Sequence, residues 1–222
     1  MGRPLVVFDL DGTLVDSAPH CALILNAMLE ARGHPGLSEA EVLPHVTAGG
    51  VAMIEALLGA RCGESAAALS EFRARYGDLP TPSRCLYPGA REALRALADQ
   101  GATLAVWSNK PQGLCDKVVG DLGLSSLFVA VVGTGPAIPL KPNTAGFDTV
   151  LRRTGGERRR CCLVGDTAHD QAAAAAAGVP FVMVAHGYGA FDQNWPGARL
   201  VDGFDALPDA IASIFAMAGS AS

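Results

Sequence analysis

Residues 5–17 of this 222-residue chain, LVVFDLDGTLVDS, decide its fold. The first four are apolar and rich in β-branched side chains, which predicts a buried strand. The strand stops at DLDGT, residues 9–13, a sequence that is typical of a tight turn. Because side chains alternate along an extended chain, we expect Asp9 and Asp11 on the same side, and Gly12 permits a sharp bend directly after them.

The carboxylates of Asp9 and Asp11 are therefore expected to share one small space. At about 4 Å they would repel each other by roughly 4 kcal/mol in a medium of dielectric constant near 20, so they need a shared proton or a cation. Clustered carboxylates suit Mg²⁺, which binds one or two of them together with water and phosphate oxygens. The alternative is that both aspartates only stabilise a loop.

Composition indicates a globular protein, since half of the residues are hydrophobic and the length suffices for one full core and a small second domain. The net charge of -5 argues against nucleic acid or an anionic membrane as a partner. The sequence has no apolar run as long as a membrane span and no room for a signal peptide before the first strand, which predicts a cytoplasmic protein. Its six cysteines lack the spacing of a zinc site, and we interpret them as reduced packing residues.

Residues 16–86 predict helices and no strand. The first helix carries Leu23, Met28 and Leu29 on or near one apolar stripe. Ser38 and Glu41 have the spacing of a capping box for a short second helix, and two further helices are expected over residues 51–58 and 64–76. We therefore expect an all-helical cap domain over residues 16–86, inserted into a core made of residues 1–15 and 87–222.

The remaining chain alternates between helix and strand, which is typical of a parallel sheet covered on both faces. The predicted fold class is α/β, a doubly wound parallel sheet with the inserted helical cap. The later strands are expected over residues 103–107, 127–132, 161–164 and 180–184, and the helices over residues 88–98, 112–122, 144–153, 168–177 and 206–217.

Polar residues stand directly after these strands, at the carboxyl ends where such sheets bind their ligands. Ser108 and Asn109 follow the second predicted strand, and Lys141 comes after the third strand and a loop. Asp166 follows the fourth strand, with Asp170 one helical turn later. The sequence thus predicts that these residues gather beside the aspartates of the first strand.

Such a group of residues is suited to phosphoryl transfer. A carboxylate can attack phosphorus and form an aspartyl-phosphate if a metal ion and cationic donors offset the repulsion between the anions. We expect Asp9 to be the nucleophile, and Mg²⁺ to be bound by Asp9, Asp166 and the main-chain carbonyl of Asp11. Asp11 would also protonate the leaving alcohol and then deprotonate the water that cleaves the acyl phosphate.

The other residues are expected to handle the phosphoryl group. Ser108 and the main chain around Asn109 would donate hydrogen bonds to phosphoryl oxygens, and Lys141 would balance negative charge at the nucleophile. Each residue also has a simpler interpretation. Ser108 and Asn109 could cap a helix, and Lys141 could be a surface lysine. Asp166 and Asp170 could be acids that favour a helix N-terminus. Their joint occurrence at successive strand ends favours catalysis.

Several segments resemble known motifs. Four of them resemble the signature motifs of haloacid-dehalogenase-superfamily hydrolases: FDLDGTLVDS at residues 8–17, VWSNKP at 106–111, KP at 141–142 and VGDTAHD at 164–170. With SNKP, two others resemble phosphoglycolate phosphatase-type members of that superfamily: YPGAREALRAL at 87–97 and AAGVPFVMVAHGYG at 176–189.

The resemblance implies a Mg²⁺-dependent phosphomonoesterase whose helical cap follows the first strand. It carries functions onto six positions: Asp9, Asp11, Ser108, Lys141, Asp166 and Asp170. In this comparison Asp170 supports the metal site from behind the ligands. Asn143 and Thr144 depart from the acid and proline that the family commonly has after its lysine motif, and His169 is a departure within the fourth motif.

The substrate expected from the resemblance is a small phosphorylated metabolite, preferably 2-phosphoglycolate, with a sugar phosphate or pyrophosphate as alternatives. Asp11 argues against a dehalogenase, and the absence of lysine from residues 16–87 argues against a phosphonatase and weakens a sugar-phosphate mutase. A phospho-aspartate signalling switch is the alternative from another class. We expect a monomer or homodimer. We expect residues of the cap to select the substrate, and the candidates are His20, Thr47, residues 48–50 and one of Arg32, Arg61, Arg73, Arg75 or Arg84.

Overall fold

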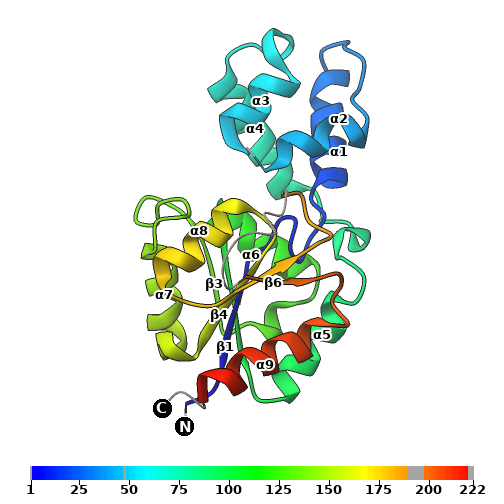
Figure 1. Ribbon diagram of the computed structural model, residues 1–222. Helices are drawn as coiled ribbons and strands as arrows, with labels where there is room; N and C mark the ends of the chain where they lie inside the picture. Colours follow the sequence, from blue (N-terminus) through cyan, green and yellow to red (C-terminus); the bar gives the residue numbers. More distant parts are fainter. Residues whose placement is uncertain (1, 48, 190–197, 220–222) are drawn as a thin grey trace. The chain divides into compact units, whose positions relative to one another are not determined.

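The computed structural model describes residues 2–47, 49–189 and 198–219 (Figure 1). The chain divides into two compact units. The first consists of Met1–Val15 and Leu86–Ser222 and is called the α/β unit below; the second, Asp16–Cys85, is called the helical unit. The structure assigns Leu86 to the α/β unit, where it forms an isolated β-bridge with Val15.

In the described residues, the α/β unit contains a six-stranded sheet in the order β3-β2-β1-β4-β5-β6, and all of its pairings are parallel. The strands are β1 (Leu5–Phe8), β2 (Thr103–Pro111), β3 (Ala130–Thr134), β4 (Cys161–Gly165), β5 (Phe181–Val184) and β6 (Ala198–Val201). β1 lies between β2 and β4 and is buried along its whole length, which explains why its sequence is apolar without alternation.

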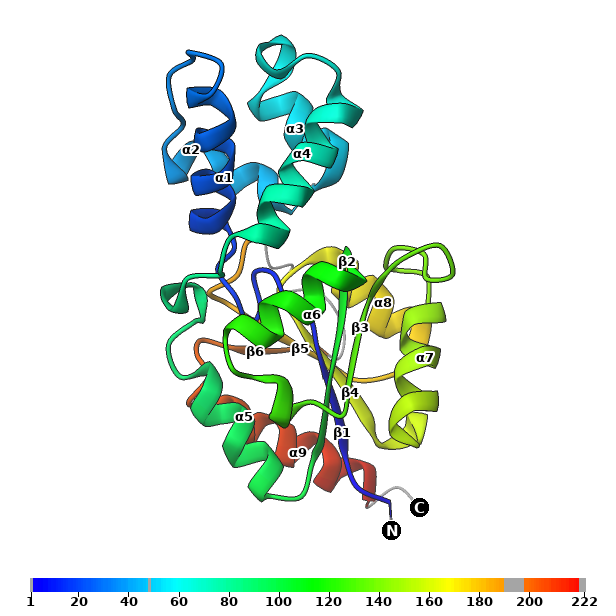
Figure 2. The same ribbon diagram turned by 180° about the vertical axis from the view of Figure 1, so that it is seen from behind.

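Helices cover both faces of this sheet (Figures 1 and 2). They are α5 (Ala90–Asp99), α6 (Gln112–Asp121), α7 (Ala145–Thr154), α8 (Ala168–Ala177) and α9 (Leu207–Gly219). Residues of α7 and α8 pack in one core cluster with alternate residues of β1, β2 and β4, whereas α5, α6 and α9 lie over the opposite face. The predicted doubly wound α/β fold is confirmed.

The core below α7 and α8 is built around large buried side chains. Trp107 and Phe147 pack with ring centroids 5.8 Å apart, and both are fully buried. Leu5 and Val7 of β1 reach this cluster, because alternate residues of a strand point to the same face. Burial of each such side chain contributes about 1.5 to 3 kcal/mol to the stability of the fold. The strands whose ends carry the polar residues are therefore firmly packed in the core.

The described residues of the helical unit form α1 (Ala18–Glu30), α2 (Glu39–Val46), α3 (Gly50–Leu57) and α4 (Ser65–Asp78). The predicted capping box is confirmed, since Ser38 accepts from the backbone N–H of Glu41 and the Glu41 side chain accepts from the backbone of Ser38. Met28 and Leu29 are fully buried as expected, but Leu23 is 51% exposed and lies off the buried stripe. The described residues also form short 3₁₀ helices, Gly59–Cys62 and Ser83–Cys85 in the helical unit and Ser125–Leu127 and Arg158–Arg160 in the α/β unit.

Three strand assignments differ from the sequence prediction. β2 does not end at Trp107 but continues beyond an irregularity in its pairing, so that Pro111 pairs with Thr134 of β3. β3 begins at Ala130, because residues 125–127 form a 3₁₀ turn. β6 was not predicted: it is an edge strand of which only Val201 is buried, and its sequence therefore lacks an apolar run.

All six cysteines are buried and none is part of a disulfide in the described residues, which agrees with their interpretation as packing residues. Within residues 2–47, 49–189 and 198–219, the structure contains no helix with the length and apolar character needed to cross a membrane.

Candidate active site

The carboxyl ends of β1 and β4 adjoin at the point where the chain changes direction across the sheet. Strands β2 and β3 extend from β1 on one side, and β4 to β6 extend on the other. The Asp9 N–H donates to the carbonyl of Val164 at 2.8 Å, so Asp9 directly continues the pairing of the two strands. Crevices of this kind are the usual ligand sites of doubly wound sheets.

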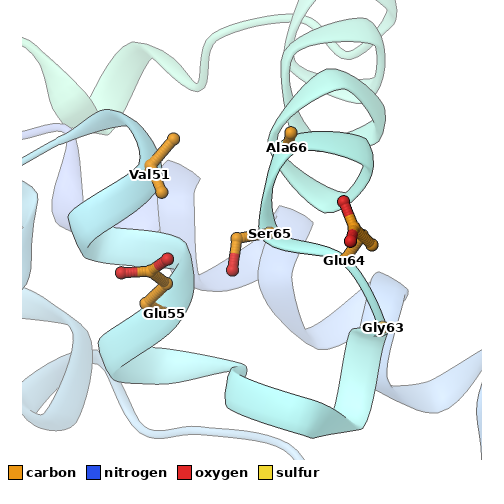
Figure 3. Close-up of a pocket in the computed structure, with 6 residues that line it drawn as sticks. All are labelled: Val51, Glu55, Gly63, Glu64, Ser65 and Ala66. Carbon is orange, nitrogen blue, oxygen red and sulfur yellow. The ribbon is translucent and has the colours of Figure 1, made fainter.

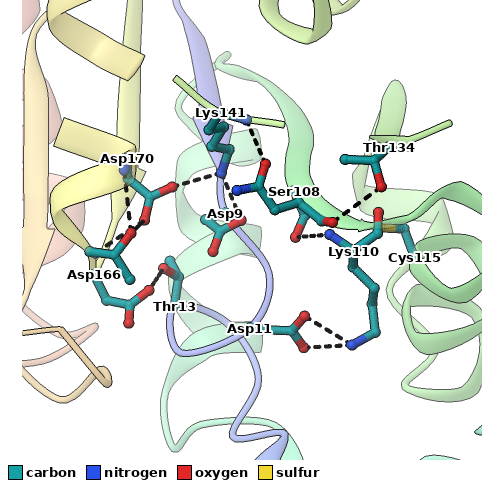
Figure 4. Close-up of polar contacts among 12 residues, drawn as sticks. Asp9, Asp11, Thr13, Ser108, Lys110, Cys115, Thr134, Lys141, Asp166 and Asp170 are labelled. Atoms are coloured by element: carbon teal, nitrogen blue, oxygen red, sulfur yellow. Dashed lines mark hydrogen bonds and ion pairs between the residues drawn. The ribbon is translucent and has the colours of Figure 1, made fainter. Parts of the chain in front are cut away.

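Three buried carboxylates meet at this crevice. Asp9, Asp166 and Asp170 each offer an oxygen such that these oxygens lie within 4.8 Å of one another (Figure 4). Asp9 follows β1, and the other two follow β4, with Asp170 in the first turn of α8. Carboxylates this close and this dry repel strongly, so the group requires cations or protons.

Lys141 supplies one cation. Its Nζ donates to Asp9 Oδ1 and to Asp170 Oδ1, both at 2.7 Å, and its side chain is only 1% exposed. The ammonium also lies 5.1 Å from the centroid of the Trp107 ring, whose face favours a positive charge. Asn109 fixes the lysine loop, since its Oδ1 accepts from the Lys141 backbone N–H at 2.7 Å.

Asp166 is held by hydrogen bonds to both carboxylate oxygens. Thr13 Oγ1 donates to Oδ1 and the backbone N–H of Tyr188 donates to Oδ2, each at 2.8 Å. The surrounding chain is packed so closely that two positions accept only glycine. A Cβ on Gly12, whose φ is +82°, would lie 2.3 Å from Asp166 Oδ2, and one on Gly187 would lie 2.1 Å from Asp166 Cβ.

Asp170 is engaged on both oxygens as well. Its Oδ1 accepts from Lys141, and its Oδ2 accepts from the backbone N–H of Thr167 at 3.1 Å and from the Thr167 hydroxyl at 2.5 Å. Thr167 and Asp170 form the capping box of α8. Asp9 differs: within the described part of the chain, no donor reaches its Oδ2. This oxygen of Asp9 is therefore available for a ligand.

Burial and like charges alter the protonation of the group. Burial raises the pKa of Asp9 to about 7; Lys141 opposes this shift, and Asp170 and Asp166 add to it. Burial also raises the pKa of Asp166 to about 6, with a further contribution from Asp170. Burial alone would lower the pKa of Lys141, but Asp170 and Asp9 outweigh it and raise the pKa, so this lysine is an ammonium at neutral pH.

The donor set fits a hard divalent cation. Carboxylate oxygens are the ligands that Mg²⁺ prefers, and a bound cation would offset both the burial and the repulsion that raise the pKa of Asp9 and of Asp166. Asp9 can face it through Oδ2. Each oxygen of Asp166 accepts one described hydrogen bond and keeps a second lone pair, whereas Asp170 Oδ2 already accepts two and Oδ1 is bonded to Lys141.

Asp11 lies outside this carboxylate group. Lys110 Nζ contacts both oxygens of Asp11 at 2.9 Å, so the two aspartates of the first motif are each neutralised by a different lysine. The carboxylates that gather with Asp9 are those of Asp166 and Asp170, whereas Asp11 pairs with Lys110. The physical reason is that the turn after β1 leads the Asp11 side chain towards the end of β2, where Lys110 lies (Figure 4).

Ser108 lies at the same strand end and is 2% exposed. Its Oγ accepts from the backbone N–H of Lys110 at 3.3 Å, which leaves the hydroxyl hydrogen to donate elsewhere. The Asn109 side chain holds Lys141, and the main-chain carbonyl of Asn109 accepts from Thr134 Oγ1 at 3.2 Å. Lys141, Asp9, Asp166 and Asp170 are thus brought together, and Ser108 directly precedes the Asn109 that holds Lys141.

The sequence analysis gave no role to Thr13, Lys110 or Tyr188. Thr13 and Lys110 lie inside the quoted motifs DGT and SNKP, so the motif positions themselves could have drawn attention to them. Tyr188 acts through its backbone N–H, which any residue type except proline would supply. Nothing in its side chain could have marked it.

Several selectivity candidates of the helical unit are buried or contact other residues of that unit, whereas Thr47 and Arg73 are exposed. His20 is fully buried and packs on Tyr76 with ring centroids 4.4 Å apart, so it is a packing residue of the helical unit. Four arginines contact other residues of the helical unit: Arg32 and Arg75 bind Glu71, Arg61 binds the Leu57 and Leu58 carbonyls, and Arg84 lies 3.9 Å from Glu39. Ala48 lies outside the described residues.

The helical unit also carries an open hollow of about 540 Å³ beside the start of α4 (Figure 3). Its lining includes the carboxylates of Glu55 and Glu64 but no cationic side chain. Such a lining would repel a phosphate ester, so the hollow does not compete with the carboxylate crevice as a phosphate site.

Comparison with known proteins agrees with this geometry. Residues 6–184 match the model of the family described as haloacid dehalogenase-like hydrolase. The phosphoglycolate phosphatase of Rhodospirillum rubrum is 37% identical over 214 residues, covering 92% of this chain and 89% of the relative. The phosphoglycolate phosphatase of Mesorhizobium japonicum is 35% identical, covering 93% of this chain and 94% of the relative.

A crystal structure of a protein from Haemophilus somnus, described as a predicted phosphoglycolate phosphatase, is also similar. It superimposes with a TM-score of 0.77 at 29% identity and covers 94% of this chain and 97% of that chain. The resemblance inferred from the motifs is confirmed. The chain belongs to the haloacid dehalogenase-like hydrolase family, within which it is an enzyme of the phosphatase type.

Proposed function

We propose that the protein is a Mg²⁺-dependent phosphomonoester hydrolase that acts through an aspartyl-phosphate at Asp9. One observation carries the proposal: a buried ammonium, Lys141, is bonded to Asp9 within a group of three carboxylates. An anionic nucleophile and an anionic phosphate ester can meet only where positive charge surrounds the reacting atoms. Lys141 supplies part of that charge, and the carboxylates can recruit the rest.

Mg²⁺ would be bound by Asp9, Asp166 and the main-chain carbonyl of Asp11. When bound, it supplies positive charge that stabilises the phosphoryl oxygens in the transition state. Asp170 supports this arrangement without being a ligand, because it orients Lys141 and caps α8. Thr13 and the Tyr188 backbone hold the Asp166 carboxylate in place for the same purpose.

In the first half of the reaction, the Oδ2 atom of Asp9 attacks phosphorus. A new Asp9 oxygen–phosphorus bond forms while the bond between phosphorus and the ester oxygen breaks, and the leaving oxygen takes a proton from Asp11. Ser108 donates its hydroxyl hydrogen to a phosphoryl oxygen, with main-chain N–H groups around Asn109 as further donors. Lys141 keeps Asp9 oriented and balances the charge.

In the second half, Asp11 accepts a proton from water as the water oxygen attacks phosphorus. The bond between phosphorus and Asp9 breaks, inorganic phosphate forms, and the Asp9 carboxylate returns to its contact with Lys141. Asp11 thus serves first as an acid and then as a base, and the cycle consumes one water.

The proposed substrate is a small phosphorylated metabolite, with 2-phosphoglycolate preferred. The names of the relatives at 37% and 35% identity support this choice. A sugar phosphate and pyrophosphate are the alternatives. We also predict that the helical unit acts as a substrate-selecting cap. The protein is further predicted to be cytoplasmic, a monomer or homodimer, and to bind neither nucleic acid nor membranes.

A substrate panel tests the proposal. Purified protein with Mg²⁺ should release phosphate from 2-phosphoglycolate with a higher kcat/KM than from glucose 6-phosphate, fructose 1-phosphate or pyrophosphate. A different ranking would replace the substrate and leave the reaction class intact. Failure to hydrolyse any ester, together with a long-lived phosphorylated Asp9 after treatment with acetyl phosphate, would favour the phospho-aspartate signalling switch.

A further inference from the structure

We propose that Lys110 is a positioning residue for Asp11, holding this carboxylate in the place from which it exchanges protons with the leaving oxygen and with water. The inference rests on the proposed function, because it assigns Asp11 the acid and base roles described above. It adds a specific part for a residue to which the proposed function gives no role.

The contact between Lys110 and Asp11 is symmetrical. Lys110 Nζ lies 2.9 Å from Oδ1 and 2.9 Å from Oδ2 (Figure 4). The lysine side chain is 9% exposed and that of Asp11 is 23% exposed, so the pair is mostly shielded from water but Asp11 remains accessible. An ion pair with little solvent around it restrains side-chain rotation far more than an exposed pair does.

The symmetry matters because Asp11 changes its protonation state twice in each cycle. If one oxygen carries a proton, the other can still accept a hydrogen bond from the ammonium. The carboxyl group is thereby retained by Lys110 both when it is ready to donate a proton and when it is ready to accept one. A lysine bonded to one oxygen alone could be displaced by the proton.

The backbone of Lys110 is fixed in turn. Its N–H donates to Ser108 Oγ at 3.3 Å, and its carbonyl accepts from Cys115 Sγ at 3.4 Å. Ser108 is the proposed donor to the phosphoryl group, so one short segment at the end of β2 fixes both that hydroxyl and the acid–base carboxylate. The placement of the phosphoryl donor relative to the proton donor then depends on the backbone of residues 108–110 together with the Lys110–Asp11 ion pair.

Two other roles for Lys110 make different predictions. A purely structural ion pair would affect the stability of the protein and the turnover of all esters alike. A ligand for an anionic group of the substrate would affect the binding of substrates that carry such a group, whatever the leaving group. A positioning residue for the acid should affect poor leaving groups selectively, because they need the proton most.

The experiment compares kcat/KM for an alkyl ester, 2-phosphoglycolate or glycerol 3-phosphate, with that for p-nitrophenyl phosphate. For each ester, kcat/KM depends only on the steps up to the departure of the leaving group. The later hydrolysis of the aspartyl-phosphate therefore does not affect the comparison. Lys110→Met should lower kcat/KM at least about tenfold on both alkyl esters and less than about threefold on the nitrophenyl ester. Lys110→Arg, which keeps the charge and donors, should recover much of the alkyl activity.

A double-mutant cycle provides the decisive measurement. In an Asp11→Asn background, Lys110→Met should cause no further loss on alkyl esters, since the group that Lys110 positions no longer exchanges a proton. The inhibition constant of inorganic phosphate should stay within about twofold of the wild-type value in Lys110→Met, because phosphoryl binding is left to other residues. Lys117→Met, which removes a lysine paired with Asp121 on α6, is the charge-matched control and should be unchanged on all esters.

Equal losses on alkyl and nitrophenyl esters, or an additive loss in the Asp11→Asn background, would overturn the positioning role in favour of a structural one. A loss confined to 2-phosphoglycolate and absent with glycerol 3-phosphate would overturn it in favour of a ligand for the substrate carboxylate. If Lys110→Met does not fold, Lys110→Arg and Lys110→Gln carry the same comparison. Failure of the proposed function would instead appear as absent wild-type turnover or an active Asp9→Asn variant.

Discussion

The ammonium of Lys141 lies 2.7 Å from Oδ1 of Asp9, and the two side chains are 1% and 10% exposed. An ion pair this dry orients the carboxylate before any substrate arrives, so no rearrangement of the nucleophile is needed at the moment of reaction. The same ammonium also donates to Asp170, so one positive charge stabilises the carboxylates of both Asp9 and Asp170.

Replacing Asp9, the proposed nucleophile, should remove turnover while leaving the fold intact. Asp9→Asn keeps the shape of the side chain but cannot form an aspartyl-phosphate, so kcat should fall by several powers of ten. The measurement is phosphate release from p-nitrophenyl phosphate, with near-ultraviolet circular dichroism as the control for packing. An Asp9→Asn protein that works at nearly the wild-type rate would require a different nucleophile.

Removing Lys141 should affect both stability and activity. Lys141→Met leaves Asp9 and Asp170 buried without their cation, and breaking a buried pair in this way costs about 3 to 5 kcal/mol. Urea unfolding should show that loss, and kcat should fall at least about a hundredfold. Adding Asp170→Asn to Lys141→Met should recover part of the stability but not the activity; a double variant as unstable as the single one would contradict the electrostatic explanation.

Chelation should abolish turnover, and added Mg²⁺ should restore it. Ca²⁺ should restore much less, because it prefers more ligands at longer distances than this compact carboxylate group offers. A second readout is thermal: Mg²⁺ should raise the melting temperature of the wild-type protein and have little effect on Asp166→Asn. Activity that survives a strong chelator would refute the metal assignment.

A methyl group at position 187 should disturb Asp166 without changing any charge. A Cβ there would lie 2.1 Å from Asp166 Cβ, so the Asp166 carboxylate has to move and its bond with Thr13 should weaken. We expect Gly187→Ala to raise the Mg²⁺ concentration needed for half-maximal activity by about tenfold or more. Gly135→Ala is the matched control, since a Cβ at Gly135 would meet no atom within 4 Å; equal behaviour of the two variants would contradict the prediction.

The raised pKa of Asp9, about 7, makes the stability of the metal-free protein depend on pH. Between the ordinary pKa of 3.8 and about 7, the folded protein binds more protons at Asp9 than the unfolded chain does. The contribution of Asp9 to stability is therefore fully present below about pH 4 and is lost as the pH rises through about 7. Melting temperatures in a chelating buffer test this: the value for wild type minus that for Asp9→Asn should fall between about pH 5 and 8, and a constant difference would show that the shift is absent.

The sequence by itself determined the parts of this protein that depend on local patterns. The apolar run of β1 without alternation requires a strand buried on both faces, and the DLDGT turn requires that it end there. The alternation of helix and strand after residue 88 requires a parallel sheet, which places polar residues that follow each strand along one edge. These constraints lie within short windows of sequence, and the fold class and the gathering of the strand-end residues followed from them.

Only the tertiary structure decided which charges meet. Lys141 and Asp9 are separated by 132 positions and Lys110 and Asp11 by 99, and no local pattern specifies which lysine reaches which aspartate. The order of strands put β4 beside β1 and so grouped Asp9 with Asp166 and Asp170. β6 escaped prediction because an exposed edge strand needs no apolar run, and it forms only because β5 offers it a partner. Pairing energies of this kind depend on distance in space, which the chain acquires only when it folds.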